Sequence, residues 1–127
     1  MREIRTHVVA GDPAPQVRVE VSEIRNRDGS HDTYLVTHGT PPCTATGQAH
    51  CTVLKFQNGP IGEVGVNGIS SEALMAVVID RLEGFQDGEF ACEDNRQALE
   101  NATLSLEWLK HRTRDRLYHG VEGRNEA

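Results

Sequence analysis

The stretch from Ser70 to Gly88 reads SSEALMAVVIDRLEGFQDG, and its hydrophobic residues recur every three or four positions. That spacing predicts an α-helix with one apolar face. Ser70 can cap the helix, because a serine hydroxyl accepts a hydrogen bond from a free amide of the first turn, and the acid Glu72 suits that turn. We expect the helix to stop at Gln86-Asp87-Gly88. Its expected apolar face comprises Leu74, Val77, Val78, Leu82 and Phe85.

A second and longer helix is expected to begin between Cys92 and Asn95 and to end near Gly120. Its apolar seam is typical of a helix packed against an antiparallel partner and comprises Leu99, Ala102, Leu106, Leu109, Thr113 and Leu117. At 1.5 Å per residue this helix is roughly 35 to 40 Å long, more than the first helix can cover. We therefore predict a helical hairpin over residues 70–119, whose uncovered part, with Leu104 and Trp108, meets another subunit.

The sequence before the hairpin has the period of β-strands. Residues 17–22 alternate apolar and polar side chains, and residues 34–36 and 51–56 are β-branched and aromatic runs between turn-rich stretches. A fourth short strand is expected over 63–66. The predicted fold class is α+β, a small N-terminal antiparallel β-sheet followed by a C-terminal antiparallel helical hairpin. We expect a single domain over 1–127, with a loose arm at 1–16, the sheet region at 17–66, the hairpin at 70–119 and a polar tail at 120–127.

Composition narrows the possible partners. The 127-residue chain is only 37% hydrophobic, so we expect it to bury further surface as a homo-oligomer. Its net charge of -6 argues against binding to long nucleic acid or to an anionic membrane, both of which require broad basic surfaces. The chain lacks a long apolar run, and its first residues lack a signal-peptide pattern, so we expect a cytoplasmic protein. Three cysteines suit reduced thiols better than a disulfide framework.

A basic cluster closes the second predicted helix. The segment 108–116 reads WLKHRTRDR, whereas residues 71–107 carry nine acids against two arginines. Arg112 and Arg116 are four residues apart and share a helix face, with Trp108 one turn below and Thr113 beside them. Such a face can hold a small anion. The alternative is that these cations only complement the dipole at the helix C-terminus.

The predicted turn between the helices is a second candidate site. An aromatic ring at Phe85 and an amide at Asn95 could stack on and hydrogen-bond to a purine. The alternative is that Phe85 belongs to the core, because it continues the apolar face of its helix.

Metal and nucleophile patterns are weaker. His38, Cys43, His50 and Cys51 lie close together in the sequence, but adjacent residues of a strand point to opposite faces, so a zinc site is disfavoured.

Cys92 near a helix N-terminus has acids around it and no evident base, which favours an inert thiol. Gly62, Gly65 and Gly68 favour turns, although such residues also let backbone amides approach a phosphate. We expect no catalytic residue, no metal and no cofactor.

Six motifs together resemble one phage family. They are KFQNGPI at 55–61, VGVNGI at 64–69, IDRLEGFQ at 79–86, FAC at 90–92, WLKHRTRDR at 108–116 and GVEG at 120–123. Over about residues 52–123 the chain resembles the Thoeris anti-defence sponges, which share a helical hairpin with the anti-CBASS cyclic-oligonucleotide sponges. The strand-forming region before the hairpin is similar to the Thoeris branch.

This resemblance implies a non-catalytic homo-oligomer, a hexamer, that sequesters immune signals. The implied ligands are glycocyclic ADP-ribose (gcADPR) and the cyclic di- and trinucleotides of CBASS. Phe85 and Asn95 match residues that hold the ADP-ribose-type ligand, and Arg112 and Arg116 match a separate cyclic-trinucleotide site. Thr113, Asn67 and Gly68 complete the expected ligand-binding set. The acidic pair Glu93-Asp94 departs from the basic residue expected before Asn95.

Two other function classes stay open at this point. One is an enzyme that hydrolyses cyclic nucleotides, which requires a base or metal beside the phosphates. The other is an oligomerisation hairpin without a small ligand.

Overall fold

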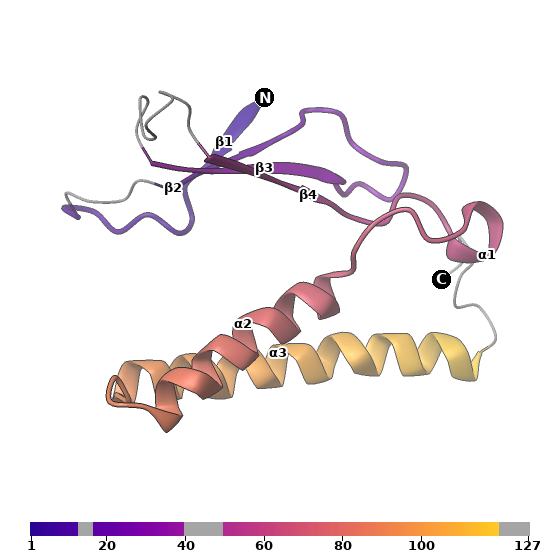
Figure 1. Ribbon diagram of the computed structural model, residues 1–127. Coiled ribbons are helices and arrows are strands. Elements are labelled where there is room, and N and C mark those ends of the chain that lie inside the picture. The colour runs from indigo at the N-terminus through magenta and orange to yellow at the C-terminus, as the bar shows by residue number, and fades with distance from the viewer. Residues whose placement is uncertain (13–16, 40–49, 120–127) are drawn as a thin grey trace. The chain divides into compact units, whose positions relative to one another are not determined.

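The computed structural model of the protein describes residues 1–12, 17–39 and 50–119 (Figure 1). The chain divides into two compact units, Met1–Gly59 and Pro60–Ala127. The boundary falls at Gly59-Pro60, several residues before the expected start of the hairpin region.

The first unit is a four-stranded antiparallel sheet with the strand order β1-β2-β3-β4. The strands are β1 (Arg2–Ile4), β2 (Val17–Val21), β3 (Thr33–His38) and β4 (His50–Lys55). β1 lies inside the segment that was expected to be a loose arm. It pairs with β2 in the register Arg2↔Val21 and Ile4↔Val19, and three residues are too few to show an alternating pattern in the sequence.

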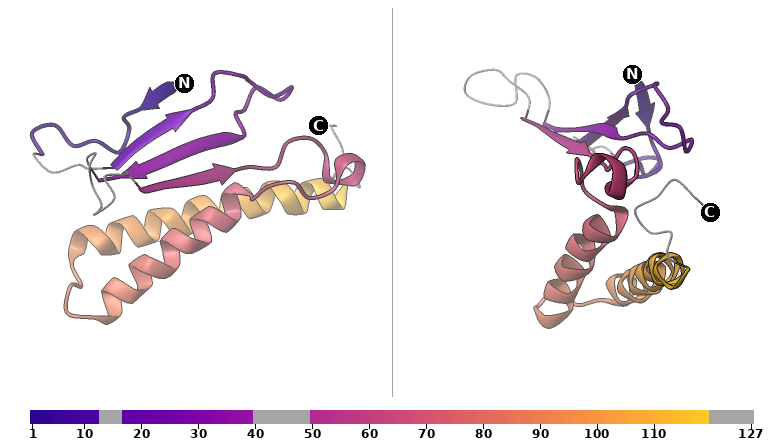
Figure 2. Two further views of the ribbon diagram at one scale, coloured as in Figure 1. Left: turned by 45° about the horizontal axis from the view of Figure 1, so that its top comes forward. Right: turned by 90° about the vertical axis from the view of Figure 1, so that its right-hand side faces the viewer.

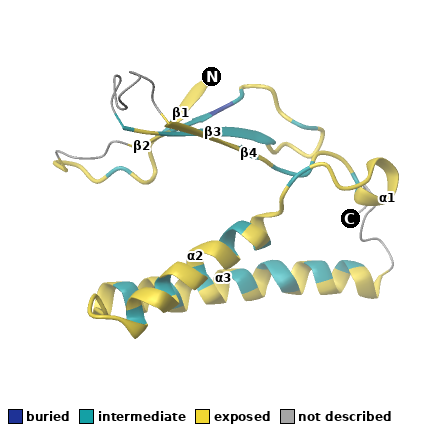
Figure 3. Ribbon diagram, viewed as in Figure 1, coloured by how far each residue is buried: buried dark blue, intermediate teal, exposed yellow. Residues whose placement is uncertain are grey.

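One face of this sheet carries most of its apolar side chains. Val19 faces Val36 and Val21 faces Tyr34 in the strand register, and successive residues of a strand point to opposite faces. Tyr34 packs edge-to-face against Phe56, with ring centroids 5.5 Å apart. Val21 is the fully buried hydrophobic residue among the described ones (Figure 3). The protomer alone therefore has a very small core.

The second unit begins with a short helix where a strand was expected. α1 (Ile61–Val64) includes the first two of residues 63–66. The carbonyl oxygen of Pro60 accepts hydrogen bonds from the amides of Glu63 and Val64, and Gly65 ends the helix with a φ of 76°. Proline before the first turn and a glycine with positive φ after it are typical boundaries of a helix. The strand prediction was wrong because these two signals outweigh a two-valine alternation.

The predicted helical hairpin is confirmed. α2 (Ser71–Asp87) begins after Ser70, whose Oγ accepts a hydrogen bond from the amide of Ala73 at 3.1 Å. α3 (Glu93–Tyr118) returns alongside α2 after a short turn (Figures 1 and 2). With 26 residues against 17, α3 is about 39 Å long and α2 about 26 Å. The last turns of α3 therefore extend past the start of α2.

The seam between the helices follows the prediction on α3 more closely than on α2. Half-buried positions recur along α3 at Asn95, Leu99, Ala102, Leu106, Leu109 and Thr113. Leu117 is exposed, because α3 extends beyond the start of α2 there.

On α2 the half-buried apolar positions are Leu74, Met75, Ile79 and Leu82, while Val77, Val78 and Phe85 are exposed. Val77, Val78 and Ile79 are consecutive and point to different sides of the helix. The sequence alone therefore did not identify which of these sides faces α3.

Much apolar surface of the hairpin stays uncovered in the protomer. Trp108 is 66% exposed, and Leu104 and Val77 are also exposed. Neither α2 nor α3 contains a fully buried residue. None of the helices in the described ranges is long and apolar enough to cross a membrane.

Candidate functional site

Phe85 lies in the last turn of α2, beside the seam rather than in it. Its ring is 38% exposed, and the neighbouring positions Leu82 and Gln86 are half-buried. The guanidinium carbon of Arg81, one helical turn earlier, lies 5.4 Å from the ring centroid. An aromatic face beside a cation suits a ligand that carries both a purine and a phosphate.

The turn after Phe85 is closed by side-chain hydrogen bonds. The amide of Cys92 donates to Oε1 of Gln86 at 3.1 Å, and the amide of Asn95 donates to Sγ of Cys92 at 3.4 Å. Cys92 is therefore the N-cap of α3. These contacts tie the last turn of α2 to the first turn of α3. The role of Gln86 was not predicted from the sequence, where its only signal is a position directly after Phe85.

Asn95 is half-buried in the first turn of α3. Its Nδ2 donates to the carbonyl oxygen of Phe90 at 3.5 Å, across the turn. This bond positions the amide group and leaves its carbonyl oxygen available as an acceptor for a ligand donor. Phe85 and Asn95 thus flank the turn between the helices, Phe85 at the end of α2 and Asn95 at the start of α3.

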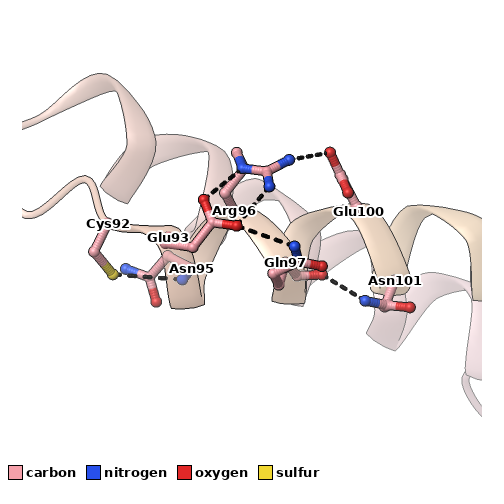
Figure 4. A network of polar contacts seen from close by, with 7 residues as sticks. All are labelled: Cys92, Glu93, Asn95, Arg96, Gln97, Glu100 and Asn101. Carbon is pink, nitrogen blue, oxygen red and sulfur yellow. Dashed lines mark hydrogen bonds and ion pairs between the residues drawn. The ribbon is translucent and has the colours of Figure 1, made fainter.

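A polar network surrounds the acidic start of α3 (Figure 4). Arg96 donates from Nε and Nη2 to both carboxylate oxygens of Glu93, at 2.8 and 2.5 Å, and from Nη1 to Glu100 at 2.5 Å. Gln97 also donates to Glu93, at 3.0 Å. The hydrogen bond from Arg96 is the larger cause that lowers the pKa of the Glu93 carboxyl, and the same bond raises the pKa of Arg96. The charge of Glu93 is therefore compensated locally.

Arg112 pairs across the hairpin. Its Nη2 lies 3.9 Å from Oε1 of Glu72, in the first turn of α2, and its side chain is 67% exposed. Thr113 is half-buried, and its Oγ1 donates to the carbonyl oxygen of Leu109 at 3.4 Å. Arg116 is half-buried in the last turn of α3. These residues lie at the open end of the hairpin, which is the end away from the turn between α2 and α3.

The other cations of the cluster form a separate group. Nζ of Lys110 lies 3.1 Å and Nη1 of Arg114 3.7 Å from the carboxylate of Glu107. The hydrogen bond from Lys110 is the main cause that lowers the pKa of Glu107. The basic segment is thus divided, because Lys110 and Arg114 share an acid of their own helix while Arg112 reaches the other helix.

The two candidate places lie at opposite ends of α2. Phe85 follows Glu72 by thirteen residues on one continuous helix, which corresponds to roughly 20 Å at 1.5 Å per residue. One small ligand does not bridge that distance within a protomer. The hairpin therefore has two separate candidate sites, an aromatic and polar one at Phe85 and a basic one at Arg112.

Comparison with known proteins identifies the helical unit. The family described as the Acb2/Tad1 hairpin domain matches residues 52–114. Residues 52–114 of this chain are an Acb2/Tad1 hairpin domain. It is also 45% identical over 73 residues to a protein of Bacillus phage SBSphiJ7 named "Thoeris anti-defense 1". The matched region covers 58% of this chain and 51% of that relative, so the chain spans about half the length of the curated relative.

Most of the predicted site residues lie inside the Acb2/Tad1 hairpin match. Phe85, Asn95, Arg112 and Thr113 fall within residues 52–114, and Arg116 lies two positions beyond it. Asn67 and Gly68 also fall inside the match, between α1 and α2. They precede Glu72 by five and four residues, at the opposite end of α2 from Phe85.

The residues considered for zinc lie outside the helical hairpin. His38 and His50 are register partners on β3 and β4, and their rings stack with centroids 4.8 Å apart. Cys43 lies outside the described residues. No cluster of three or more metal-ligating side chains occurs within residues 1–12, 17–39 and 50–119. Cys51 and Cys92 are exposed free thiols.

Proposed function

We propose that this protein is a phage anti-defence sponge, which binds and sequesters cyclic nucleotide immune signals without cleaving them. The observation that carries the proposal is the exposed ring of Phe85 beside Arg81, fixed to Asn95 through a hydrogen-bonded turn, within a matched Acb2/Tad1 hairpin domain. The relative named "Thoeris anti-defense 1" supports the same class of function.

The proposed ligand at the turn is gcADPR or a cyclic dinucleotide. Phe85 stacks on a base, Asn95 hydrogen-bonds to it, and Arg81 lies close enough to the ring to meet a phosphate. The acidic pair at the start of α3 opposes this binding less than the sequence suggested, because Arg96 neutralises Glu93. Within the described residues, no ion pair involves Asp94, the other acid of this pair.

The proposed ligand at the open end of the hairpin is a cyclic trinucleotide. Arg112 and Arg116 supply charge-assisted hydrogen bonds to phosphates, with Thr113 between them. A ligand with several phosphates suits this site if copies of the pair are repeated around a symmetry axis.

Binding by a sponge depends on mass action, so tight binding and slow release replace transition-state stabilisation. We propose a homo-oligomer, a hexamer, that acts in the cytoplasm of the infected cell. The exposed residues Val77, Leu104 and Trp108 supply apolar surface for assembly.

Native mass spectrometry with gcADPR and cyclic triadenylate tests the proposal, since it reports oligomer mass, ligand and stoichiometry together. We expect hexamers that carry both ligands at once. Heating the complex should then release each signal with its mass unchanged. Release of a cleaved product would instead favour the hydrolase, and absence of any adduct would favour a ligand-free oligomerisation hairpin.

A further inference from the structure

The ion pair between Arg112 and Glu72 joins the two helices at the proposed trinucleotide site. Oε1 of Glu72 lies 3.9 Å from Nη2 of Arg112, and the Glu72 side chain is 27% exposed. Glu72 is one of the first residues of α2, whereas Arg112 is in the last two turns of α3. The guanidinium group that is proposed to bind phosphate therefore has a carboxylate beside it in the empty protein.

This ion pair is weak enough to be replaced. The Arg112 side chain is mostly exposed and the separation is close to the limit for an ion pair, and pairs of this kind contribute little to stability. When the ion pair with Arg112 is broken, Glu72 keeps a second favourable interaction, because an acid in the first turn of a helix interacts with the helix dipole. Displacing the pair therefore costs the protein little.

We propose that Glu72 is a competing carboxylate that sets the affinity of the Arg112 site. This inference rests on the proposed trinucleotide function. A phosphate bound to Arg112 takes the place of the Glu72 carboxylate or lies close to it, so binding must overcome an existing attraction and a like charge. In an oligomer the same carboxylate would offset repulsion among Arg112 side chains before a ligand arrives.

The competition has a defined direction. Removing the charge of Glu72 should strengthen trinucleotide binding, whereas a residue that merely positions Arg112 would weaken binding when changed. An exposed ion pair of this kind corresponds to about a two- to fivefold change in affinity. The gain multiplies with the number of Arg112 side chains that one ligand contacts.

The test is isothermal titration of the full-length protein with cyclic triadenylate. Glu72→Gln should bind more tightly than wild type by about two- to fivefold for each Arg112 contacted. The matched control is Glu83→Gln, which removes the same charge from α2 at a position that forms no ion pair with any described residue. This control should bind like wild type.

A second variant separates competition from loss of helix stability. Glu72→Asp keeps an acid in the first turn of α2 but shortens its reach to Arg112, so it should also bind more tightly than wild type. Weaker or unchanged binding by both Glu72 variants would overturn the competition while the proposed function stands. If wild type and every variant fail to bind cyclic triadenylate, the proposed trinucleotide function is overturned together with this inference.

Discussion

The guanidinium carbon of Arg81 lies 5.4 Å from the centroid of the Phe85 ring, and both side chains belong to the last two turns of α2. A cation at this distance attracts the electron-rich face of the ring and restricts its motion. The ring remains 38% exposed, so it still offers surface to a ligand. Phe85 therefore offers an apolar ring face next to the positive charge of Arg81. This combination suits a ligand that carries a base and phosphates.

Phe85→Ala should abolish tight binding of gcADPR. Base stacking on an aromatic ring is worth about 1 to 3 kcal/mol, which corresponds to roughly a fivefold to more than a hundredfold loss in affinity. Asn95→Ala should also weaken binding, because it removes the amide at the same turn. Titration calorimetry measures the affinity, and native mass spectrometry checks that the oligomer is intact.

Phe90→Ala is the matched control for the ring. Phe90 is an exposed aromatic at the same turn, and Asn95 contacts its backbone carbonyl rather than its side chain. This variant should keep most of the affinity for gcADPR. Unfolding of Phe85→Ala would show that the ring is needed for the core, contrary to the stacking role.

Arg112→Ala or Arg116→Ala should remove cyclic-trinucleotide binding and spare gcADPR binding. Each charge-assisted hydrogen bond contributes about 1.5 to 3 kcal/mol, and the loss multiplies over the subunits that share a ligand. Arg114→Ala provides the control on the same helix, since Arg114 is paired with Glu107. It should leave both affinities nearly unchanged.

Titration of both ligands against these three variants tests whether the basic cluster is a separate ligand site or only stabilises the end of α3. Equal loss of both ligands in Arg112→Ala would mean that the hairpin has one site rather than two. Unchanged trinucleotide affinity with a lowered melting temperature would show that Arg112 and Arg116 only complement the end of α3.

The hairpin was predictable because its signals are local and agree with one another. Ser70 caps α2 as expected, and the three- and four-residue spacing along α3 places Leu99 and Leu106 in the seam. The partner of Arg112 was not predictable, because pairing with Glu72 depends on how far the two helices are shifted along each other. The bond from Cys92 to Gln86 likewise needs the conformation of the turn. Sequence thus indicated which residues bear the chemistry, and the structure supplied their contacts.

Asp94→Asn should strengthen gcADPR binding more than Glu93→Gln does. Arg96 already compensates the charge of Glu93, whereas Asp94 forms no ion pair within the described part of the chain. A unit charge about 10 Å from a ligand phosphate in water changes the energy by roughly 0.4 kcal/mol, about a twofold change in affinity. Titrations at low and high salt check the effect, which should shrink as salt rises. Equal responses of the two variants would contradict local compensation.

Glu93→Gln should reduce the acid sensitivity of the protein. Arg96 and Gln97 lower the pKa of the Glu93 carboxyl in the folded state below its ordinary value of 4.5. The contribution of this carboxylate to stability is therefore fully present above the unfolded pKa and is lost as pH falls through the folded pKa. Wild-type protein should lose melting temperature as the pH falls from above 4.5 to below the folded pKa of Glu93, and Glu93→Gln should lose less over the same interval.

Thermal unfolding followed by circular dichroism across that pH interval measures the difference. Asp28 and Glu107 also have lowered pKa values, so both proteins should retain a common loss of stability in acid, and the comparison between them isolates Glu93. Glu83→Gln removes a carboxylate from α2 outside the network and should keep the wild-type slope. If Glu93→Gln and wild type decline in parallel, the carboxylate and Arg96 do not stabilise the start of α3. The turn that holds Asn95 would then depend on Gln86 and Cys92 alone.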